Sequence, residues 1–179
     1  MTLKEQYTKQ IIPALSKEFG ITNHMAVPNV RSVTVAVGLS QGLKDPKFFE
    51  VAESVLTRIT GQKPVKTKAK KSISNFKIRQ GMVVGMRVTL RGKRMWDFLE
   101  KFVRVTFARV RDFRGISSSH VDAQGNITVG FREFLSFPEI RPDEVERIHG
   151  LQVTVTTTAG DHAKGLALLK ALGFPFHKD

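Results

Sequence analysis

The stretch Gly-Met-Val-Val-Gly-Met-Arg-Val-Thr-Leu-Arg, residues 81–91, alternates apolar and polar side chains along its second half. Apolar side chains occupy the even positions from Val84 to Leu90, while Arg87, Thr89 and Arg91 occupy the odd ones. Successive side chains of an extended chain point to opposite faces. The stretch therefore predicts a strand with one buried face and one cationic outer face.

Similar two-residue periods occur in segments 30–38, 127–131 and 151–158, and these predict further strands. Four-residue apolar periods predict helices over residues 3–19, 45–59, 95–113 and about 161–172. Strands that alternate in polarity are typical of sheets with one solvated face, whereas parallel sheets covered on both faces show continuous apolar runs. The sequence predicts an α+β fold with a mixed or antiparallel sheet. Helices would pack on one face, leaving a polar, basic face and a protruding basic loop.

Size and composition predict one domain over residues 1–179. The chain is 41% hydrophobic, contains no Cys, and shows neither a linker nor an internal repeat. The first 19 residues lack the apolar centre of a secretion signal, and no apolar run is long enough to span a membrane. We therefore expect a cytoplasmic protein without a membrane partner.

Positive charge is concentrated between Ser54 and Trp96, where 12 Lys and Arg occur without a single Asp or Glu. The rest of the chain carries 17 basic and 16 acidic residues, so this stretch holds nearly all of the net charge of +13. A surface needed only for solubility normally mixes both signs. The missing acids therefore indicate a polyanionic partner. The interspersed Ser, Thr, Asn and Gln favour folded RNA over lipid headgroups.

Affinity and selectivity would come from different side chains of this stretch. Lys and Arg attract phosphates in a salt-dependent way, whereas short polar groups can hydrogen-bond 2′-hydroxyls and bulged bases. Residues 70–81 are long for a simple hairpin connection, and a loop of this composition is typically functional or disordered. We expect a basic finger that touches a second RNA. The candidates for reading RNA shape are Gln62, Thr67, Ser72, Asn75 and Thr89.

No constellation predicts catalysis, a cofactor or a metal site. The five His residues are dispersed, and the Gly61 to Pro64 segment lacks the glycine spacing and the Lys-Ser/Thr ending of a phosphate loop. Glu133 and Glu139 are better interpreted as solvated carboxylates than as an acid pair. Two alternatives remain open: a nucleic-acid enzyme with a basic groove, and a regulatory RNA-binding protein.

Residues 59–64 (ITGQKP) and 67–81 (TKAKKSISNFKIRQG) closely resemble the family of bacterial large-subunit ribosomal protein five. The segments RVTLRG at 87–92, RDFRG at 111–115 and GFPF at 173–176 follow in the family's order. The resemblance covers essentially the whole chain. It implies a structural, non-enzymatic constituent of the large ribosomal subunit.

The resemblance also implies partners and sites. The partners are 5S rRNA in the central protuberance, large-subunit rRNA, P-site tRNA, neighbouring ribosomal proteins and a basic protein of the small-subunit head. The candidate rRNA-binding residues are Arg31, Ser32, Gln62, Lys63, Thr67, Lys68, Lys70, Lys71, Thr89 and Arg91. The candidate tRNA-binding residues are Ser72, Ser74, Asn75, Phe76, Lys77 and Arg79. Asp143, Glu144 and Glu146 are the candidates for a bridge to the small subunit.

Two positions depart from the family pattern. Ala36 replaces a usual Asn, which removes a side-chain hydrogen bond expected at the 5S rRNA surface. The turn at 121–127, usually Phe-Asp-Gly-Arg-Gly-Asn-Tyr, is Val-Asp-Ala-Gln-Gly-Asn-Ile here. Neither change touches the basic stretch, so we expect RNA binding on a cytoplasmic ribosome, with an organelle ribosome as the alternative.

Overall fold

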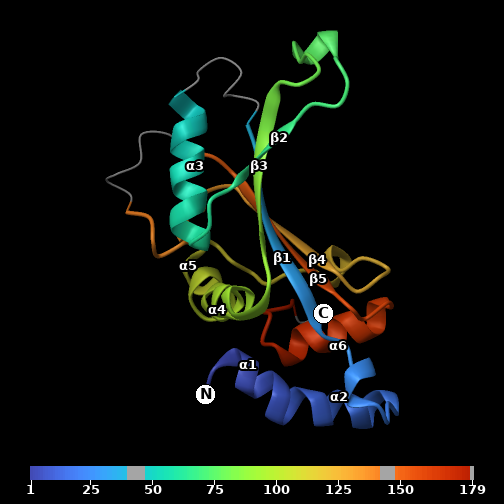
Figure 1. Cartoon of the computed structure of the whole chain (residues 1–179). Helices are drawn as coiled ribbons and strands as arrows, with labels where there is room; N and C mark the ends of the chain where they lie inside the picture. Colours follow the sequence, from blue (N-terminus) through green and yellow to red (C-terminus); the bar gives the residue numbers. More distant parts are fainter. Residues whose placement is uncertain (40–46, 142–147, 178–179) are drawn as a thin grey trace. The chain divides into compact units, whose positions relative to one another are not determined.

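The computed structural model describes residues 1–39, 47–141 and 148–177. Five strands form one sheet in the order β2-β3-β1-β5-β4 (Figure 1). Neighbouring strands are antiparallel. In one such pair, Val65 lies opposite Arg87 and Thr67 lies opposite Gly85. The predicted α+β class with an antiparallel sheet is confirmed. The strands are β1 Val30–Gly38, β2 Val65–Lys68, β3 Val83–Leu90, β4 Ile127–Phe131 and β5 Leu151–Thr157.

Strand β2 was not predicted as an element. Its four residues contain one apolar side chain, Val65, which is 63% exposed. An alternation this short carries no usable period. Backbone pairing with β3, and not side-chain burial, makes this segment a strand.

The helices agree with the predicted ones except at some ends, and the predicted start of the second helix at residues 45 and 46 lies outside the described residues. The first helix is continuous through a π-helical turn, and the helix expected over 95–113 begins earlier and ends at Arg109. This long helix ends at Arg109 because the backbone leaves the helical conformation. Val110 is extended, with ψ 128°, and Asp112 is left-handed, with φ 51°. The helices are α1 Leu3–Gln6, π-helical Tyr7–Ile11, α2 Ile12–Phe19, α3 Lys47–Thr60, α4 Gly92–Lys101, π-helical Phe102–Thr106, α5 Phe107–Arg109 and α6 His162–Ala171. Short 3₁₀ turns occur at His24–Ala26, Ser74–Phe76, Ser118–His120 and Phe134–Ser136.

The chain forms two compact units. Unit 1 comprises Met1–Val33, Leu90–Val129 and Thr154–Asp179, and unit 2 comprises Thr34–Thr89 and Gly130–Val153. Strands β1, β3, β4 and β5 each continue from one unit into the other. The expectation of one domain stays a prediction.

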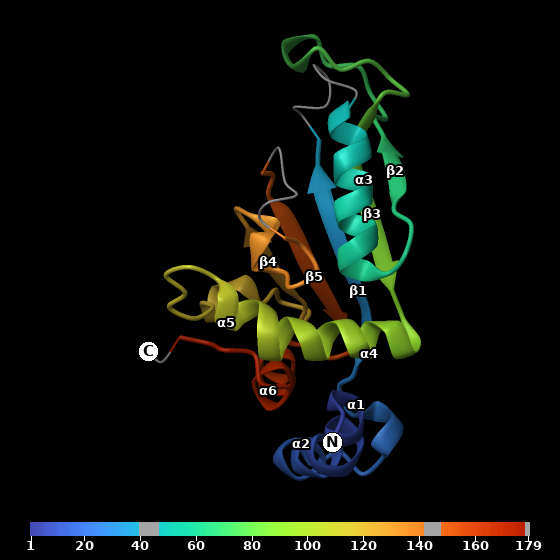
Figure 2. The ribbon, with the colours of Figure 1, turned by 90° about the vertical axis from the view of Figure 1, so that its left-hand side faces the viewer.

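In unit 2, helix α3 covers one face of strands β1, β2 and β3, as both views show (Figures 1 and 2). Its buried side chains include Phe48, Ala52 and Leu56, each at most 2% exposed. Val35 and Val88 from β1 and β3 are buried as well, at no more than 1% exposure. The apolar half of the strand alternation therefore supplies the core of this unit.

In unit 1, an aromatic cluster joins the long helix to the end of the chain. The Phe102 ring lies 4.6 Å from the Phe107 ring and 6.2 Å from the Phe174 ring, measured between centroids. These three rings are at most 4% exposed. Large aromatic surfaces of this kind contribute strongly to core stability.

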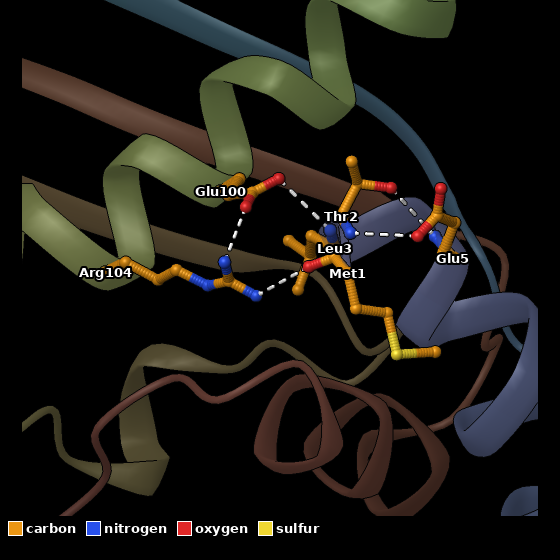
Figure 3. Close-up of polar contacts among 6 residues, drawn as sticks. All are labelled: Met1, Thr2, Leu3, Glu5, Glu100 and Arg104. Carbon is orange, nitrogen blue, oxygen red and sulfur yellow. Dashed lines mark hydrogen bonds and ion pairs between the residues drawn. The ribbon is translucent and has the colours of Figure 1, made fainter.

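The N-terminal helix is fastened to α4 by polar contacts (Figure 3). A Glu100 carboxylate oxygen accepts a hydrogen bond from the Leu3 backbone N–H at 3.1 Å, and the other oxygen pairs with Arg104 at 2.6 Å. Thr2 and Glu5 close a capping box at the start of α1. Glu100 thereby satisfies a backbone N–H that a helix N-terminus leaves free.

Candidate nucleic-acid interface

One face of the sheet in unit 2 is lined by small and polar side chains. The hydroxyls of Thr34 on β1 and Thr89 on β3 lie 3.5 Å apart. A Cβ added to Gly85 would lie 2.8 Å from the Val37 carbonyl oxygen and 3.0 Å from the Thr67 hydroxyl. Gly is therefore needed at position 85, where two neighbouring strands approach closely. The result is a low surface on which a partner's backbone can come near the sheet.

The turn after α3 brings Gln62 to this face. Gly61 takes φ 65°, and the Thr60 hydroxyl donates to the Leu56 carbonyl at 2.7 Å and accepts from the Gln62 N–H at 3.3 Å. The half-buried Gln62 side chain donates from Nε2 to the Thr89 carbonyl at 3.5 Å. Two candidates that lie 27 residues apart in sequence, Gln62 and Thr89, are thus neighbours. No described residue donates a hydrogen bond to the Gln62 Oε1 atom, so this atom can accept one from a ligand.

Part of the positive charge near this turn is compensated. Glu53, the last acidic residue before the basic stretch, contacts Lys63 at 3.9 Å and Lys66 at 3.2 Å. The Lys63 side chain is 84% exposed, so this ion pair is weak and screened. Free cationic charge is therefore greater at Lys68, Lys70 and Lys71, which are exposed.

The basic loop at 70–81 continues the β2–β3 pair as a hydrogen-bonded hairpin. Ile73 and Ile78 exchange backbone hydrogen bonds of 2.8 and 3.1 Å, and Lys77 caps the 3₁₀ turn between them with φ 55°. The Ser72 hydroxyl accepts from the Gln80 N–H at 2.9 Å. The hairpin extends past the first turn of α3 in both views (Figures 1 and 2). Its tip presents Phe76, which is 68% exposed.

All six tRNA candidates belong to this hairpin, and each is exposed. An exposed aromatic ring among cations offers a stacking surface for an unpaired base. The hairpin also carries Lys70 and Lys71 from the rRNA set, so the two candidate groups share one element. The candidate residues in this hairpin are Lys70, Lys71, Ser72, Ser74, Asn75, Phe76, Lys77 and Arg79.

Three rRNA candidates belong to unit 1. Arg31 and Arg91 are exposed, whereas Ser32 is 8% exposed. The Ser32 hydroxyl therefore offers little surface to a ligand. The bridge candidates Asp143, Glu144 and Glu146 lie outside the described residues.

A shallow hollow in unit 2 was not predicted from the sequence. It measures about 310 Å³, and three of its lining residues are glycines. A Cβ added to Gly38 or Gly130 would meet no atom within 4 Å, so these positions open the hollow. The signal in the sequence is the presence of Gly38 and Gly130 at polar positions of the predicted strands. Its lining is Ala36, Gly38, Gly130, Phe131, Gly150, Leu151 and Gln152.

The altered turn at 121–127 is closed by its own polar groups. Asp122 accepts backbone hydrogen bonds from Gln124 at 2.9 Å and Asn126 at 2.8 Å, and the Asn126 side chain donates to it at 2.8 Å. The hydrogen bond from the Asn126 side chain is the main cause of a lowered Asp122 pKa. Asn126 Oδ1 in turn accepts from the Thr157 N–H at 2.9 Å. Loss of a Gly, a cation and two aromatic residues leaves this turn anchored to β5.

Within residues 1–39, 47–141 and 148–177, no group of three or more His, Asp or Glu side chains is placed to hold a metal ion. No helix of this described part is long and apolar enough to cross a membrane. The geometry consists of a low polar face, cationic side chains and an exposed hairpin. Such a surface can bind a polyanion by charge and hydrogen bonding.

Comparisons with known proteins match this description over nearly the whole chain. Residues 23–79 match the family model of "Ribosomal protein L5", and residues 83–176 match the model of the C-terminus of the same ribosomal protein family. The chain is 48% identical over 176 residues to large ribosomal subunit protein uL5 of Halothermothrix orenii, covering 98% of each chain. It is 48% identical over 174 residues to the uL5 proteins of Herpetosiphon aurantiacus and Francisella tularensis, covering 97% of each.

These findings confirm the family resemblance and the expectation of a non-enzymatic protein. They also confirm the ribosome of the cytoplasm as its location, since the matched relatives are bacterial ribosomal proteins. With family models covering both halves of the sequence and relatives at 48% identity over its length, the chain belongs to the ribosomal protein L5 family, whose members are RNA-associated structural proteins of the ribosome.

Proposed function

We propose that this protein binds 5S rRNA in the central protuberance of the large subunit through the polar sheet face of unit 2 and the turn at 60–64. The observation that carries the proposal is the placement of Gln62 against Thr89 beside the low surface at Gly85. Small side chains let an RNA backbone approach, and the Gln62 amide and the Thr hydroxyls can hydrogen-bond its 2′-hydroxyls. Lys68, Lys70 and Lys71 supply the attraction to phosphates.

The hairpin at 70–81 contacts the P-site tRNA in this proposal. Its exposed Phe76, with Lys77 and Arg79 beside it, suits an RNA surface with accessible bases and phosphates. The acidic segment with Asp143, Glu144 and Glu146 contacts a basic protein of the small-subunit head. The negative charge of this segment, opposite to that of the partner, supports the contact with the small-subunit protein.

The first experiment is a salt series with the purified protein against 5S rRNA, a tRNA and a random RNA of similar length. Selective binding of 5S rRNA near physiological salt is expected, because hydrogen bonds to RNA shape persist when phosphate attraction is screened. Equal binding to all three RNAs, lost together as salt rises, would leave only a nonspecific basic surface.

Gln62→Ala tests the proposed shape-reading role directly. The variant should lose affinity for 5S rRNA by about tenfold, as expected for about 1.4 kcal/mol of hydrogen bonding, and lose little affinity for random RNA. Gln10→Ala, on the exposed surface of the N-terminal helix, is the matched control. Equal losses on both RNAs would show that Gln62 does not read shape.

A further inference from the structure

Three arginines lie within six residues at the end of the long helix of unit 1, outside the acid-free stretch. The side chains of Arg109, Arg111 and Arg114 are all exposed. None of them forms an ion pair with another described residue. The acidic residue among them, Asp112, leaves this segment, residues 109–114, with a net positive charge. We call it the arginine loop.

The arginine loop is held from beneath by aromatic rings. Phe113 stacks on Phe107 with centroids 5.3 Å apart, and Phe107 lies 6.0 Å from Phe174. Left-handed Asp112, with φ 51°, stands between Arg111 and Phe113. Among residues with a Cβ, Asp is one of the few that adopt this conformation readily. The left-handed conformation reverses the chain so that Phe113 joins the cluster while Arg111 remains exposed.

Backbone contacts fasten the far end of the loop to the end of the chain. Ile116 N–H donates to the Pro175 carbonyl at 2.8 Å, and His177 N–H donates to the Ile116 carbonyl at 2.9 Å. Gly115 has φ 101°, and a Cβ there would lie 2.9 Å from the His177 nitrogen. The loop is therefore braced on both sides, and its arginines are displayed from a fixed backbone. Such preorganisation lowers the entropy cost of binding.

The chemistry of this display fits RNA phosphates better than a lipid surface. Guanidinium groups bind phosphate oxygens through two parallel N–H donors. The adjacent hydroxyls of Ser117 and Ser119, 2.8 Å apart in an exposed turn, add groups that hydrogen-bond phosphate or ribose. Apolar side chains that insert between headgroups strengthen lipid binding, and residues 107–120 expose no large hydrophobic side chain.

The loop belongs to the helical layer of unit 1. Both views place α4 and α5 on one side of the segments of β1, β4 and β5 that belong to this unit (Figures 1 and 2). The loop follows α5 directly and is braced by the chain end, so it shares no element with the polar strand face of unit 2. We propose that the arginine loop binds the phosphate backbone of large-subunit rRNA, an RNA distinct from the 5S rRNA and the P-site tRNA of the proposed function. The inference rests on that function only for the identity of the first RNA.

The test compares two triple variants of the full chain. Arg109→Gln/Arg111→Gln/Arg114→Gln removes the three guanidinium groups, and Lys4→Gln/Lys9→Gln/Lys17→Gln removes three exposed charges from the N-terminal helix of the same unit. Each protein is titrated with 5S rRNA. Each protein, alone and as a complex with 5S rRNA, is then titrated with protein-free large-subunit rRNA across a salt series. Phosphatidylglycerol vesicles form a third arm.

The arginine variant should bind 5S rRNA as the parent does and bind large-subunit rRNA at least about tenfold more weakly, with a salt slope smaller by about 2 to 3. The lysine variant should change neither titration. Arg111→Gln alone, expected to reduce the slope by about one, keeps the test decisive if the triple variant fails to fold.

Three other outcomes overturn the proposal. An equal loss on 5S rRNA would assign the loop to the first RNA, and a loss confined to vesicles would assign it to lipid. Unchanged binding in every arm would leave a solvated loop. Failure of the parent to bind 5S rRNA would refute the proposed function alone, because titration of the free protein with large-subunit rRNA tests the loop independently.

Discussion

At the scale of single residues, Gly165 on α6 and Gly125 in the turn before β4 meet without room for a side chain. A Cβ on Gly165 would overlap the Gly125 Cα and lie 2.6 Å from the Gly125 carbonyl oxygen. Gly125 itself has φ 81°, which disfavours any other residue. The contact holds the helix against the turn that Asp122 and Asn126 close.

Gly165→Ala should therefore destabilise the protein by about 1–3 kcal/mol, the usual cost of overpacking a closed site. Urea unfolding would show this as a lower midpoint at an unchanged slope. Gly38→Ala is the control, because a Cβ there meets no atom within 4 Å. Equal midpoints for the two variants would contradict the close approach.

His149 is a second residue whose burial has a measurable consequence. It is 7% exposed, and its ring centroid lies 4.5 Å from that of Phe134 and 5.7 Å from that of Phe48. Its Nδ1 is 3.2 Å from the Gly150 carbonyl oxygen. Burial lowers the His149 pKa from its ordinary value of 6.5, because an imidazolium is poorly solvated among aromatic rings.

A lowered pKa in the folded state means that the unfolded chain binds a proton more readily. The contribution of His149 is therefore complete above its ordinary pKa and is lost as pH falls through that value towards the folded pKa. His149→Phe, which keeps a ring between Phe48 and Phe134, should reduce the loss of unfolding free energy between about pH 8 and about pH 5.

Urea unfolding at several pH values would measure the effect. His24→Gln, at an exposed position, is the control for the loss of one imidazole. If the His149→Phe protein kept the parent's pH dependence, another group would determine how the free energy of unfolding changes with pH.

At the scale of elements, the hairpin at 70–81 has two separable parts. The pairs Ala69 with Met82 and Ile73 with Ile78 define its stem through backbone hydrogen bonds. Residues 74–77 form the exposed tip. Because the stem is closed at Ile73 and Ile78, the tip can be shortened without unpairing the strands.

Replacing residues 74–77 with Asn-Gly, which favours a tight two-residue turn, should leave 5S rRNA binding unchanged and weaken P-site tRNA contact. Crosslinking of P-site tRNA on reconstituted large subunits would measure the loss. Phe76→Ala, which keeps the tip length, should give a partial loss if the ring stacks on a base. Reduced 5S rRNA binding by the shortened hairpin would place the tip in the other interface.

At the scale of the whole molecule, the charge is divided unevenly over the surface. Lys63 and Lys66 share Glu53, whereas Lys68, Lys70 and Lys71 have no nearby acid in sequence. Long-range attraction of RNA should therefore depend mainly on the latter three.

Changing Lys68, Lys70 and Lys71 together to Ala should lower the salt slope of RNA binding by about one unit for each lost phosphate contact. The control is the variant Lys4→Ala/Lys9→Ala/Lys17→Ala, which loses the same amount of charge. Filter binding between about 50 and 300 mM salt would measure both slopes. An unchanged slope for the first variant would refute the electrostatic part of the proposal.

The sequence by itself determined the alternating strands, the helical periods and the concentration of positive charge. These properties are local, since a side chain's face follows from residues two to four positions away. They were sufficient for the α+β class, and the family motifs were sufficient for the ribosomal assignment. The contents of the basic stretch also identified Gln62, Thr89 and a protruding loop at 70–81 as candidates for RNA binding.

Only the tertiary structure decided which distant residues meet. It paired β2 with β3, placed Gln62 at Thr89, ended the long helix at Arg109 and braced the arginine loop against the chain end. It also formed the hollow from glycines on separate segments. Each of these features depends on contacts between residues far apart in sequence, and no local period records such contacts because chain folding alone brings them together.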